Sequence, residues 1–317
     1  MLDGRVAVVT GAGQGLGRAE AIALAAAGAG VVVNDVGPAA DEVVEEIAAA
    51  GGDAVAHRGD VARTADADAL VATAIERFGD LDVLVNNAGI VRDRTVFKMS
   101  DEEWDSVVRV HLRGHFATTR AATAHWRARA KASGPRDASV VNTASEAFLN
   151  TPAGQPNYAA AKAGIVALTL ATAKSCRAYG VRANAVCPRA DTPMTASVLD
   201  DLPAPDRARL GPDHVAPLVV YLASTAAAGV TGDVFVAYGS RVGVLAPPTL
   251  AATFDAPGGR WSAPALAEAL AAHGAGGALD LGFAGDAVVA AGTDLWGATS
   301  DQQRADREAV DGSGNRR

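Results

Sequence analysis

Short β-branched segments alternate with longer helical patterns along the first 240 residues of the chain, and this alternation restricts the folds open to it. Strands that alternate with helices of 10–15 residues predict βαβ units joined into a parallel sheet. The continuous apolar run Val31-Val-Val33 is typical of a strand that is covered on both faces. We therefore expect an α/β fold with a doubly wound parallel sheet of about seven strands. The expected strands are residues 5–10, 31–35, 54–57, 81–85, 139–142, 181–186 and 234–237, and the expected helices are residues 18–29, 41–50, 65–78, 104–132, 157–179 and 214–223.

The pattern changes after residue 240, where Pro247-Pro248 and Gly258-Gly259 interrupt the chain and one clear helix is expected over residues 263–273. We expect one domain over residues 1–240 and a C-terminal appendage packed on it over residues 241–296. The polar stretch 297–317 has balanced charges and predicts a flexible tail. Within the main domain, the segment 191–212 is rich in Pro, Asp and Leu, which favours a mobile loop over the site.

Composition narrows the classes of function. Hydrophobic residues make up 49% of the 317 residues and charged residues 20%, which fits a globular chain with a large core. The net charge is −8 without a Lys/Arg stripe, so we expect no nucleic-acid partner. The longest apolar run, residues 21–33, is too short for a membrane span, and no basic segment precedes the first strand. We expect no membrane contact, no signal peptide and a cytoplasmic location. Cys176 and Cys187 lack metal-binding spacing, so we expect neither a metal site nor a disulfide.

A glycine-rich turn, Thr10-Gly-Ala-Gly-Gln-Gly-Leu-Gly17, joins the first expected strand to the first expected helix. Glycines let the backbone approach a pyrophosphate closely, and the N-terminus of the helix supplies N–H donors and a positive dipole end. An ordinary tight turn would explain the glycines alone, but their place between strand and helix favours a nucleotide. The residues predicted to bind it are Gly11, Gly13, Gln14, Gly15, Leu16 and Gly17.

Asp35 ends the second expected strand, 18 residues after Gly17. A carboxylate at this place can accept hydrogen bonds from the adenosine ribose hydroxyls and would repel a 2′-phosphate, so we expect NAD rather than NADP. A solvated strand end is the alternative explanation of Asp35. Asp60 and Val61 follow the third strand and are predicted at the adenine, although a capping role fits Asp60 nearly as well. After the fourth strand, an ordinary β–α turn would explain the residues Asn87, Ala88 and Gly89 on their own, and we assign them to the cofactor site only in combination with the other motifs.

Tyr158 and Lys162 are four residues apart on an expected helix, which places both on one face. Tyrosine is a poor base at neutral pH, but a nearby ammonium and a positively charged nicotinamide favour the tyrosinate and lower its pKa. Ser145 lies 13 residues before Tyr158, just after a strand, where its hydroxyl could share the substrate oxygen. Each residue has a structural explanation when it is taken alone, but their order along the chain favours a catalytic site.

Together these motifs resemble the short-chain dehydrogenase/reductase family over about residues 4–240. The resemblance implies a Rossmann-type sheet, a nicotinamide cofactor and hydride transfer at a carbinol or ketone carbon. It implies that Ser145 orients the substrate, that Tyr158 is the acid/base, and that Lys162 binds the ribose and tunes Tyr158. Thr192 matches the position that binds the carboxamide, with Pro188 close by. Family members are mostly dimers or tetramers, so we expect a homodimer or homotetramer. The matching residues are Thr10-Gly11-x-x-x-Gly15-x-Gly17, Asn86-Asn87-Ala88-Gly89, Ser145 and Tyr158-x-x-x-Lys162.

Two residues depart from the family pattern. In the family, an Asn at one helix position holds a water in the proton relay, and His111 matches this position. His111 could relay a proton or only pack between helices. Arg189 stands in Cys187-Pro188-Arg189 where many members have a glycine. We expect Arg189 near the nicotinamide or facing an anionic substrate.

Other segments narrow the resemblance. Asn34-Asp35, Arg92-Asp-Arg94 and Val110-His-Leu-Arg-Gly114 resemble the (3R)-hydroxyacyl-CoA dehydrogenase domain of peroxisomal multifunctional enzymes of type 2. Ser145-Glu146 and Arg189 resemble bacterial hydroxyacyl-CoA and 17β-hydroxysteroid dehydrogenases of steroid side-chain degradation. The resemblance implies that NAD oxidises (3R)-3-hydroxyacyl-CoA to 3-oxoacyl-CoA, and a steroid-bearing acyl chain is one candidate.

Three alternatives stay open. The chain could be a 17β-hydroxysteroid dehydrogenase, or a reductase of 3-oxoacyl thioesters or ketones that works in the opposite direction. A dinucleotide-binding protein without catalysis is more remote, because Ser145, Tyr158 and Lys162 are all intact. The expected partner is a small-molecule or CoA-thioester substrate.

Overall fold

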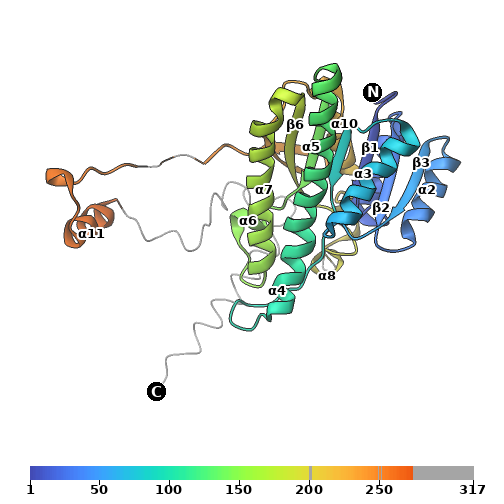
Figure 1. Ribbon diagram of the computed structural model, residues 1–317. Coiled ribbons are helices and arrows are strands. Elements are labelled where there is room, and N and C mark those ends of the chain that lie inside the picture. The colour runs from blue at the N-terminus through green and yellow to red at the C-terminus, as the bar shows by residue number, and fades with distance from the viewer. Residues whose placement is uncertain (200–201, 249, 251, 274–317) are drawn as a thin grey trace. The chain divides into compact units, whose positions relative to one another are not determined.

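In the computed structural model, which describes residues 1–199, 202–248, 250 and 252–273, eight strands form one sheet in the order β3-β2-β1-β4-β5-β6-β7-β8 (Figure 1). The first seven strands are parallel. The chain builds outward from β1 in one direction and from β4 in the other, which confirms the doubly wound α/β fold. The strands are β1 (Val6–Thr10), β2 (Gly30–Asp35), β3 (Asp53–Arg58), β4 (Val83–Asn86), β5 (Ala138–Thr143), β6 (Val181–Pro188), β7 (Val234–Tyr238) and β8 (Arg241–Val244).

The eighth strand was not expected, because residues 241–244 were assigned to the C-terminal appendage. β8 pairs antiparallel with β7, with Tyr238 opposite Arg241. Gly239 adopts a φ of +50°, which suits the two-residue turn between these strands. Every residue of β8 is exposed, and its four residues are too few to give a clear strand pattern in the sequence.

Helices cover both faces of the sheet. One hydrophobic cluster joins the sheet to α1, α2 and α10, and includes Leu24, Ile47 and Val219. A second cluster joins the other face to α3, α5 and α7, and includes Leu70 and Trp126. Consecutive strand residues point to opposite faces, so the strands β1 to β6 contribute to both clusters. The helices are α1 (Gly15–Ala26), α2 (Ala39–Ala49), α3 (Thr64–Phe78), α4 (Asp101–Val108), α5 (Gly114–Ser133), α6 (Ala147–Asn150), α7 (Pro156–Cys176), α8 (Ala196–Leu199), α9 (Ala204–Ala208), α10 (Ala216–Ala223) and α11 (Ala263–Ala272), with shorter turns η1 (Arg109–Arg113), η2 (Arg177–Tyr179), η3 (Pro212–His214), η4 (Thr225–Ala227) and η5 (Pro257–Gly259).

The expected helix over residues 104–132 begins earlier and is not uniform. Ser100 and Glu103 form a capping box at the start of α4, in which the Ser100 hydroxyl accepts from the Glu103 N–H at 3.2 Å and the Glu103 carboxylate accepts from the Ser100 N–H at 3.0 Å. Between α4 and α5, the turn η1 is a π-helix centred on His111. Such π-turns are frequent at functional sites.

The segment 191–212 is also more ordered than a plain loop, since it contains α8 and α9. Arg207 donates to the Asp191 carboxylate at 2.6 Å, and Leu210 is buried. The expected mobility of this segment stays a prediction.

The described residues from Ala246 onward belong to a second unit, separate from the one that contains the sheet. In it, α11 begins after Ser262, whose hydroxyl accepts from the Ala265 N–H at 3.3 Å. The division into a domain, a packed appendage and a tail stays a prediction, and residues 274–317 lie outside the described part of the chain. None of the helices in the described ranges is long and apolar enough to cross a membrane.

Glu20 is an acidic side chain buried in α1. It is 1% exposed, and its Oε2 has no hydrogen-bond partner among the described residues. Burial raises the pKa of Glu20 from 4.5 to about 8. The folded protein therefore keeps this proton to a higher pH than the unfolded chain does, and the contribution of Glu20 to stability is lost as the pH rises from about 4.5 through about 8.

We expect Glu20→Gln to remove this pH dependence. We would measure the free energy of unfolding in urea between pH 5 and pH 8.5. Over this range the free energy of unfolding of the wild type should fall by a few kcal/mol relative to that of the variant, because one unit of pKa difference corresponds to about 1.4 kcal/mol. Glu45→Gln, at an exposed position of α2, is the matched control and should follow the wild type. Parallel curves for the wild type and Glu20→Gln would contradict the assignment.

Candidate active site

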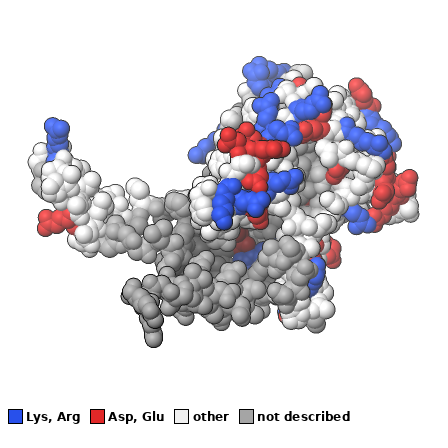
Figure 2. All heavy atoms as spheres, turned by 90° about the horizontal axis from the view of Figure 1, so that it is seen from below, with Lys and Arg blue, Asp and Glu red and all other residues white. Residues whose placement is uncertain are grey.

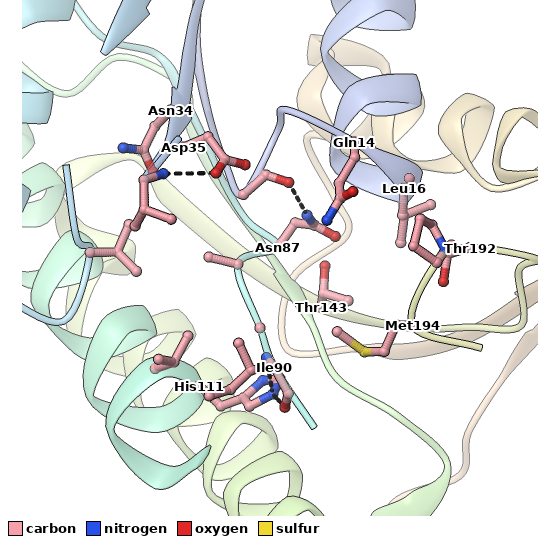
Figure 3. Close-up of a pocket in the computed structure, with 18 of the residues that line it drawn as sticks. Gln14, Leu16, Asn34, Asp35, Asn87, Ile90, His111, Thr143, Thr192 and Met194 are labelled. Carbon is pink, nitrogen blue, oxygen red and sulfur yellow. Dashed lines mark hydrogen bonds between the residues drawn. The ribbon is translucent and has the colours of Figure 1, made fainter. Parts of the chain in front are cut away.

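The carboxyl ends of several parallel strands meet around a cavity of about 500 Å³ beside β1 and β4, where the strand order reverses. Such switch points are the usual binding crevices of open α/β sheets, and the volume is typical of a ligand pocket. Figure 3 shows Asp35 and Gln14 on one part of its wall, His111 and Ile90 on another, and Thr192 and Met194 on a third. The predicted site residues that line the cavity are Gly11, Gln14, Gly15, Leu16, Asp35, Asp60, Val61, Asn87, Ala88, Gly89, His111, Tyr158, Lys162, Pro188 and Thr192.

Three predicted residues, Gly13, Gly17 and Ser145, are not among the lining residues but contact residues that are. The remaining lining residues were not predicted from the sequence. They are Asn34, Val36, Gly59, Ile90, Arg109, Val110, Thr143, Ala144, Ala190, Pro193, Met194 and Thr195.

The glycine turn and the turn after β4 are locked together. The Asn87 side-chain amide donates to the backbone oxygen of Thr10 at 3.1 Å. It also donates to the backbone oxygen of Gly11 at 3.1 Å (Figure 3). In return, the Thr10 hydroxyl accepts from the backbone N–H of Asn87 at 3.0 Å and of Ala88 at 3.1 Å. Asn87 therefore stabilises the β–α turn that the sequence analysis gave as its alternative role, and it also lines the cavity.

Gly17 marks the tightest approach in this region. A Cβ there would lie 2.4 Å from the Gly11 oxygen and 2.4 Å from the Asn87 amide nitrogen. The turn can keep its shape only without a side chain at position 17.

We expect Gly17→Ala to weaken NADH binding roughly tenfold or more, in line with the 1–3 kcal/mol that overpacking usually costs. The added methyl group would push the turn away from the position that presents its N–H groups at the start of α1. Gly37→Ala is the matched control, because a Cβ at Gly37 meets nothing within 4 Å. Fluorescence titration with NADH on folded protein measures both variants, and wild-type affinity in Gly17→Ala would contradict the prediction.

Asp35 is held at the rim of the cavity by the backbone. Its Oδ2 accepts from the Gly13 N–H at 3.0 Å, and its Oδ1 accepts from Val36 at 2.7 Å and Gly37 at 3.3 Å. A Cβ at Gly13 would lie 2.9 Å from Oδ2. Gly13 thus contributes by letting the glycine turn approach this fixed negative charge.

The sequence left two roles open for Asp60, one in capping and one in the cofactor site, and the structure has contacts that fit each. Its Oδ1 accepts from the Ala62 N–H at 3.0 Å, which is a capping contact, and Asp60 also lines the cavity. Arg109 donates to Asp60 Oδ2 at 2.6 Å. Burial raises the pKa of Asp60, but the hydrogen bonds from Arg109 and Ala62 outweigh this and lower it overall. Asn34, which the sequence analysis did not place in the site, donates to the Gly59 oxygen at 3.1 Å and lines the same part of the wall.

Ser145, His111 and the α7 residues Tyr158 and Lys162 come together although they lie on three different parts of the chain. The Ser145 hydroxyl is close enough to the Tyr158 phenol to lower the pKa of that phenol, and it accepts from the Ala147 N–H at 3.2 Å. The His111 ring meets the Tyr158 ring edge-on, with centroids 5.1 Å apart. The Lys162 Nζ lies 5.3 Å from the centre of the Tyr158 ring. A hydroxyl pair beside a buried amine can position a substrate alcohol and take its proton.

The pKa of Tyr158 departs from the sequence expectation. Loss of solvent raises it from 10.0 to about 12, and the hydrogen bond from Ser145 only partly opposes this. Lys162 is 2% exposed and donates to the Thr143 oxygen at 2.6 Å, and burial lowers its pKa to about 7. The lowering of the Tyr158 pKa that the sequence predicted is therefore not found, because burial dominates and Ser145 is the group that opposes it. The phenolate needs a further positive charge beside the ring.

His111 is buried and neutral at physiological pH. Its Nε2 lies 2.7 Å from the Ile90 oxygen, which accepts when Nε2 carries the proton. Burial, followed by the charge of Lys162, lowers the pKa of His111 well below 6.5. Its Nδ1 is buried and has no partner among the described residues, so it can act as an acceptor. Packing and relay therefore both stay open for His111.

A second histidine, His115, lies one helical turn further on and was missed. It is 2% exposed, and burial lowers its pKa to about 3. The i, i+4 spacing of His111 and His115 is the signal that could have found it.

Arg189, which was expected near the nicotinamide or facing an anionic substrate, pairs with a carboxylate of the chain itself. It donates to the Glu146 carboxylate through Nε at 2.5 Å and through Nη2 at 2.8 Å. The sequence could not indicate this partner, because the two residues are 43 positions apart. Within the described ranges, no group of three His, Cys, Asp or Glu residues is arranged to hold a metal ion.

The residues around the cavity fit a nicotinamide dinucleotide. The start of α1 directs N–H groups at one wall, Asp35 presents a fixed carboxylate acceptor at the rim, and Tyr158 and Lys162 lie at another part of the lining. The N–H groups suit a phosphate, the Asp35 carboxylate suits a ribose hydroxyl, and Tyr158 with Lys162 suits a reacting carbinol.

The chain is similar to several known proteins. The sequence profile of the family described as short chain dehydrogenase matches residues 5–203. The hydroxyacyl-CoA dehydrogenase ChsB1 of Mycobacterium tuberculosis is 53% identical over 286 residues, which cover 87% of this chain and 90% of that protein. A crystal structure of a short chain dehydrogenase from Mycobacterium avium aligns with a TM-score of 0.79 and 47% identity, over 86% of this chain and 94% of that chain.

A peroxisomal multifunctional enzyme type 2, from Mus musculus, is 44% identical over 231 residues. These cover 69% of this chain but 30% of that enzyme, so the chain corresponds to less than a third of it.

Proposed function

The chain belongs to the short-chain dehydrogenase family, and we propose that it oxidises the C3 hydroxyl of (3R)-3-hydroxyacyl-CoA thioesters with NAD. It is an oxidoreductase that acts on CH–OH groups and uses a nicotinamide dinucleotide. The observation that carries the proposal is the assembly of Ser145, Tyr158 and Lys162 at a cavity shaped for that cofactor. The similarity to a named hydroxyacyl-CoA dehydrogenase over most of both chains supports the thioester as substrate.

In the proposed mechanism, the Ser145 hydroxyl and the Tyr158 phenolate bind the hydroxyl group of the substrate together. Tyr158 takes the hydroxyl proton as the carbonyl forms, and Ser145 stabilises the developing carbonyl oxygen. Lys162 stays fixed by the Thr143 oxygen and places its charge beside the Tyr158 ring. When bound, the oxidised nicotinamide supplies the hydride acceptor and the additional positive charge that favours the Tyr158 phenolate. Holding the reacting groups in this geometry accounts for several kcal/mol of rate enhancement.

The charge at Asp35 supports NAD rather than NADP. Three backbone N–H groups orient the carboxylate, so it cannot swing away from a 2′-phosphate without losing these hydrogen bonds. A ribose 2′-hydroxyl can instead donate to it.

The experiment compares kcat/KM for (3R)-3-hydroxyacyl-CoA, for a 17β-hydroxysteroid and for a simple secondary alcohol, each with NAD and NADP. We expect the thioester with NAD to be preferred by a wide margin. Thioesters with short, long and steroid-bearing acyl chains then define the substrate range. Preference for the free steroid would replace the proposal with a 17β-hydroxysteroid dehydrogenase, and faster reduction with NADPH would replace it with a reductase.

We also propose a homodimer or homotetramer that forms through α5 and α7, which lie side by side in Figure 1. Phe116 of α5 is 50% exposed and would be covered in such an assembly. Light scattering that gives the mass of a single chain at micromolar concentration would contradict this proposal.

A further inference from the structure

Glu146 and Arg189 form an ion pair just beyond the paired ends of two central strands. The last paired residues of β5 and β6 are Thr143 and Val186. Glu146 and Arg189 each follow three residues later, so the strand register brings them opposite one another. Their side chains are 12% and 10% exposed.

The contact is a two-point one. The Arg189 Nε donates to one carboxylate oxygen of Glu146 at 2.5 Å and Nη2 donates to the other at 2.8 Å. Charges removed from water to this degree are costly unless the geometry is good, and the planar arginine fork matches a carboxylate in a way that lysine cannot.

The arginine end of the pair is anchored to the neighbouring strand β7. The Arg189 backbone N–H donates to the Ala237 oxygen at 3.0 Å, and its guanidinium lies 4.5 Å from the centre of the Tyr238 ring. Arg189 is thus held from two directions, and Glu146 is the group that attaches to it.

The pair joins two segments that both serve the site. Ser145, whose hydroxyl meets the Tyr158 phenol, directly precedes Glu146. Pro188 and Ala190 flank Arg189, and both line the cavity. A shift of Glu146 would therefore move the Ser145 hydroxyl relative to Tyr158 and to the cofactor side of the cavity.

We propose that Glu146 and Arg189 are positioning residues that hold the Ser145 hydroxyl in place for the reaction. They do not bind substrate themselves, and their effect on turnover passes through Ser145. This inference rests on the proposed roles of Ser145 and Tyr158, but not on the identity of the alcohol that is oxidised.

The test is a double-mutant cycle with Glu146→Gln and Ser145→Ala, measured as kcat and KM on whichever of the thioester, steroid or secondary alcohol the wild type oxidises. We expect Glu146→Gln to lower kcat about tenfold with little change in KM for NAD, because sub-ångström misplacement of a reacting group has effects of this order. In the Ser145→Ala background, the same change should have almost no further effect on kcat, since the group through which it acts is already gone.

Asp137→Asn is the matched control. Asp137 accepts from Arg182 at 2.8 Å, and this second arginine–carboxylate pair lies at the opposite ends of the same two strands, β5 and β6. We expect Asp137→Asn to lower the melting temperature without changing kcat. Should Glu146→Gln fail to fold, Arg189→Lys replaces it in the cycle, because lysine keeps the charge but not the two-point contact.

Multiplicative losses of kcat in the double variant would overturn the proposal, because Glu146 would then act independently of Ser145. So would a Glu146→Gln variant that loses only thermal stability, like the control. A wild type that oxidises the steroid or the simple alcohol but not the thioester refutes the proposed substrate and leaves this test intact.

Discussion

Replacing Tyr158 with Phe is expected to lower kcat for alcohol oxidation about a thousandfold, while NADH binds with nearly wild-type affinity. General acid–base groups usually contribute 10²–10⁴-fold to a rate, and the phenol oxygen is the proton acceptor in the proposed mechanism. The phenylalanine ring would keep the edge-on contact with His111, so the packing of α7 against η1 should persist. Stopped-flow or steady-state formation of NADH measures the loss, and fluorescence titration measures binding.

Tyr179→Phe controls for the loss of a tyrosine hydroxyl as such. The Tyr179 hydroxyl accepts from Arg127 at 3.3 Å at an exposed contact of η2, and it is not among the residues that line the cavity. Wild-type turnover is expected from this variant. If Tyr158→Phe retained more than a tenth of the wild-type kcat, Tyr158 would not be the acid/base.

Replacing Asp35 with Asn is expected to shift the NAD-to-NADP preference, measured as the ratio of kcat/KM values, roughly a hundredfold toward NADP. The change keeps the shape of the side chain and an oxygen that can accept from Gly13. It removes a charged acceptor of the ribose hydroxyl, worth about 1.5–3 kcal/mol, and the repulsion of a 2′-phosphate.

Asp41→Asn is the control for net charge in the same region. Asp41 is an exposed residue of α2 that pairs with Arg58, and its replacement should leave the cofactor ratio unchanged. An unchanged ratio in Asp35→Asn would mean that Asp35 serves only as an acceptor for backbone N–H groups.

The sequence predicted most of the sheet because buried parallel strands carry continuous apolar runs, as in β1 and β2. It missed β8, whose exposed residues carry no such pattern. It also predicted a single helix where the chain forms α4, η1 and α5, because Arg109 to Arg113 remain helical in their periodicity. A π-turn changes hydrogen bonding but leaves no marker in composition.

The candidate site could likewise be predicted from the sequence only in part. Ser145, Tyr158 and Lys162 could be predicted because their spacing and order form a known combination. The partner of Arg189 could not, because Glu146 reaches it through the register of β5 and β6. The direction of the Tyr158 pKa shift also needed the structure, because it depends on how far burial outweighs the hydrogen bond from Ser145.

The most direct test of the proposed function follows an isotope through the reaction. The purified chain is given NAD with (3R)-3-hydroxyacyl-CoA that carries deuterium at C3, and in parallel with the (3S) epimer. We expect rapid turnover of the (3R) epimer, one NADH per 3-oxoacyl-CoA formed, and the deuterium in the reduced cofactor. Failure to oxidise either epimer, preference for (3S), or loss of the deuterium to water would contradict the assignment of this chain as a (3R)-3-hydroxyacyl-CoA dehydrogenase.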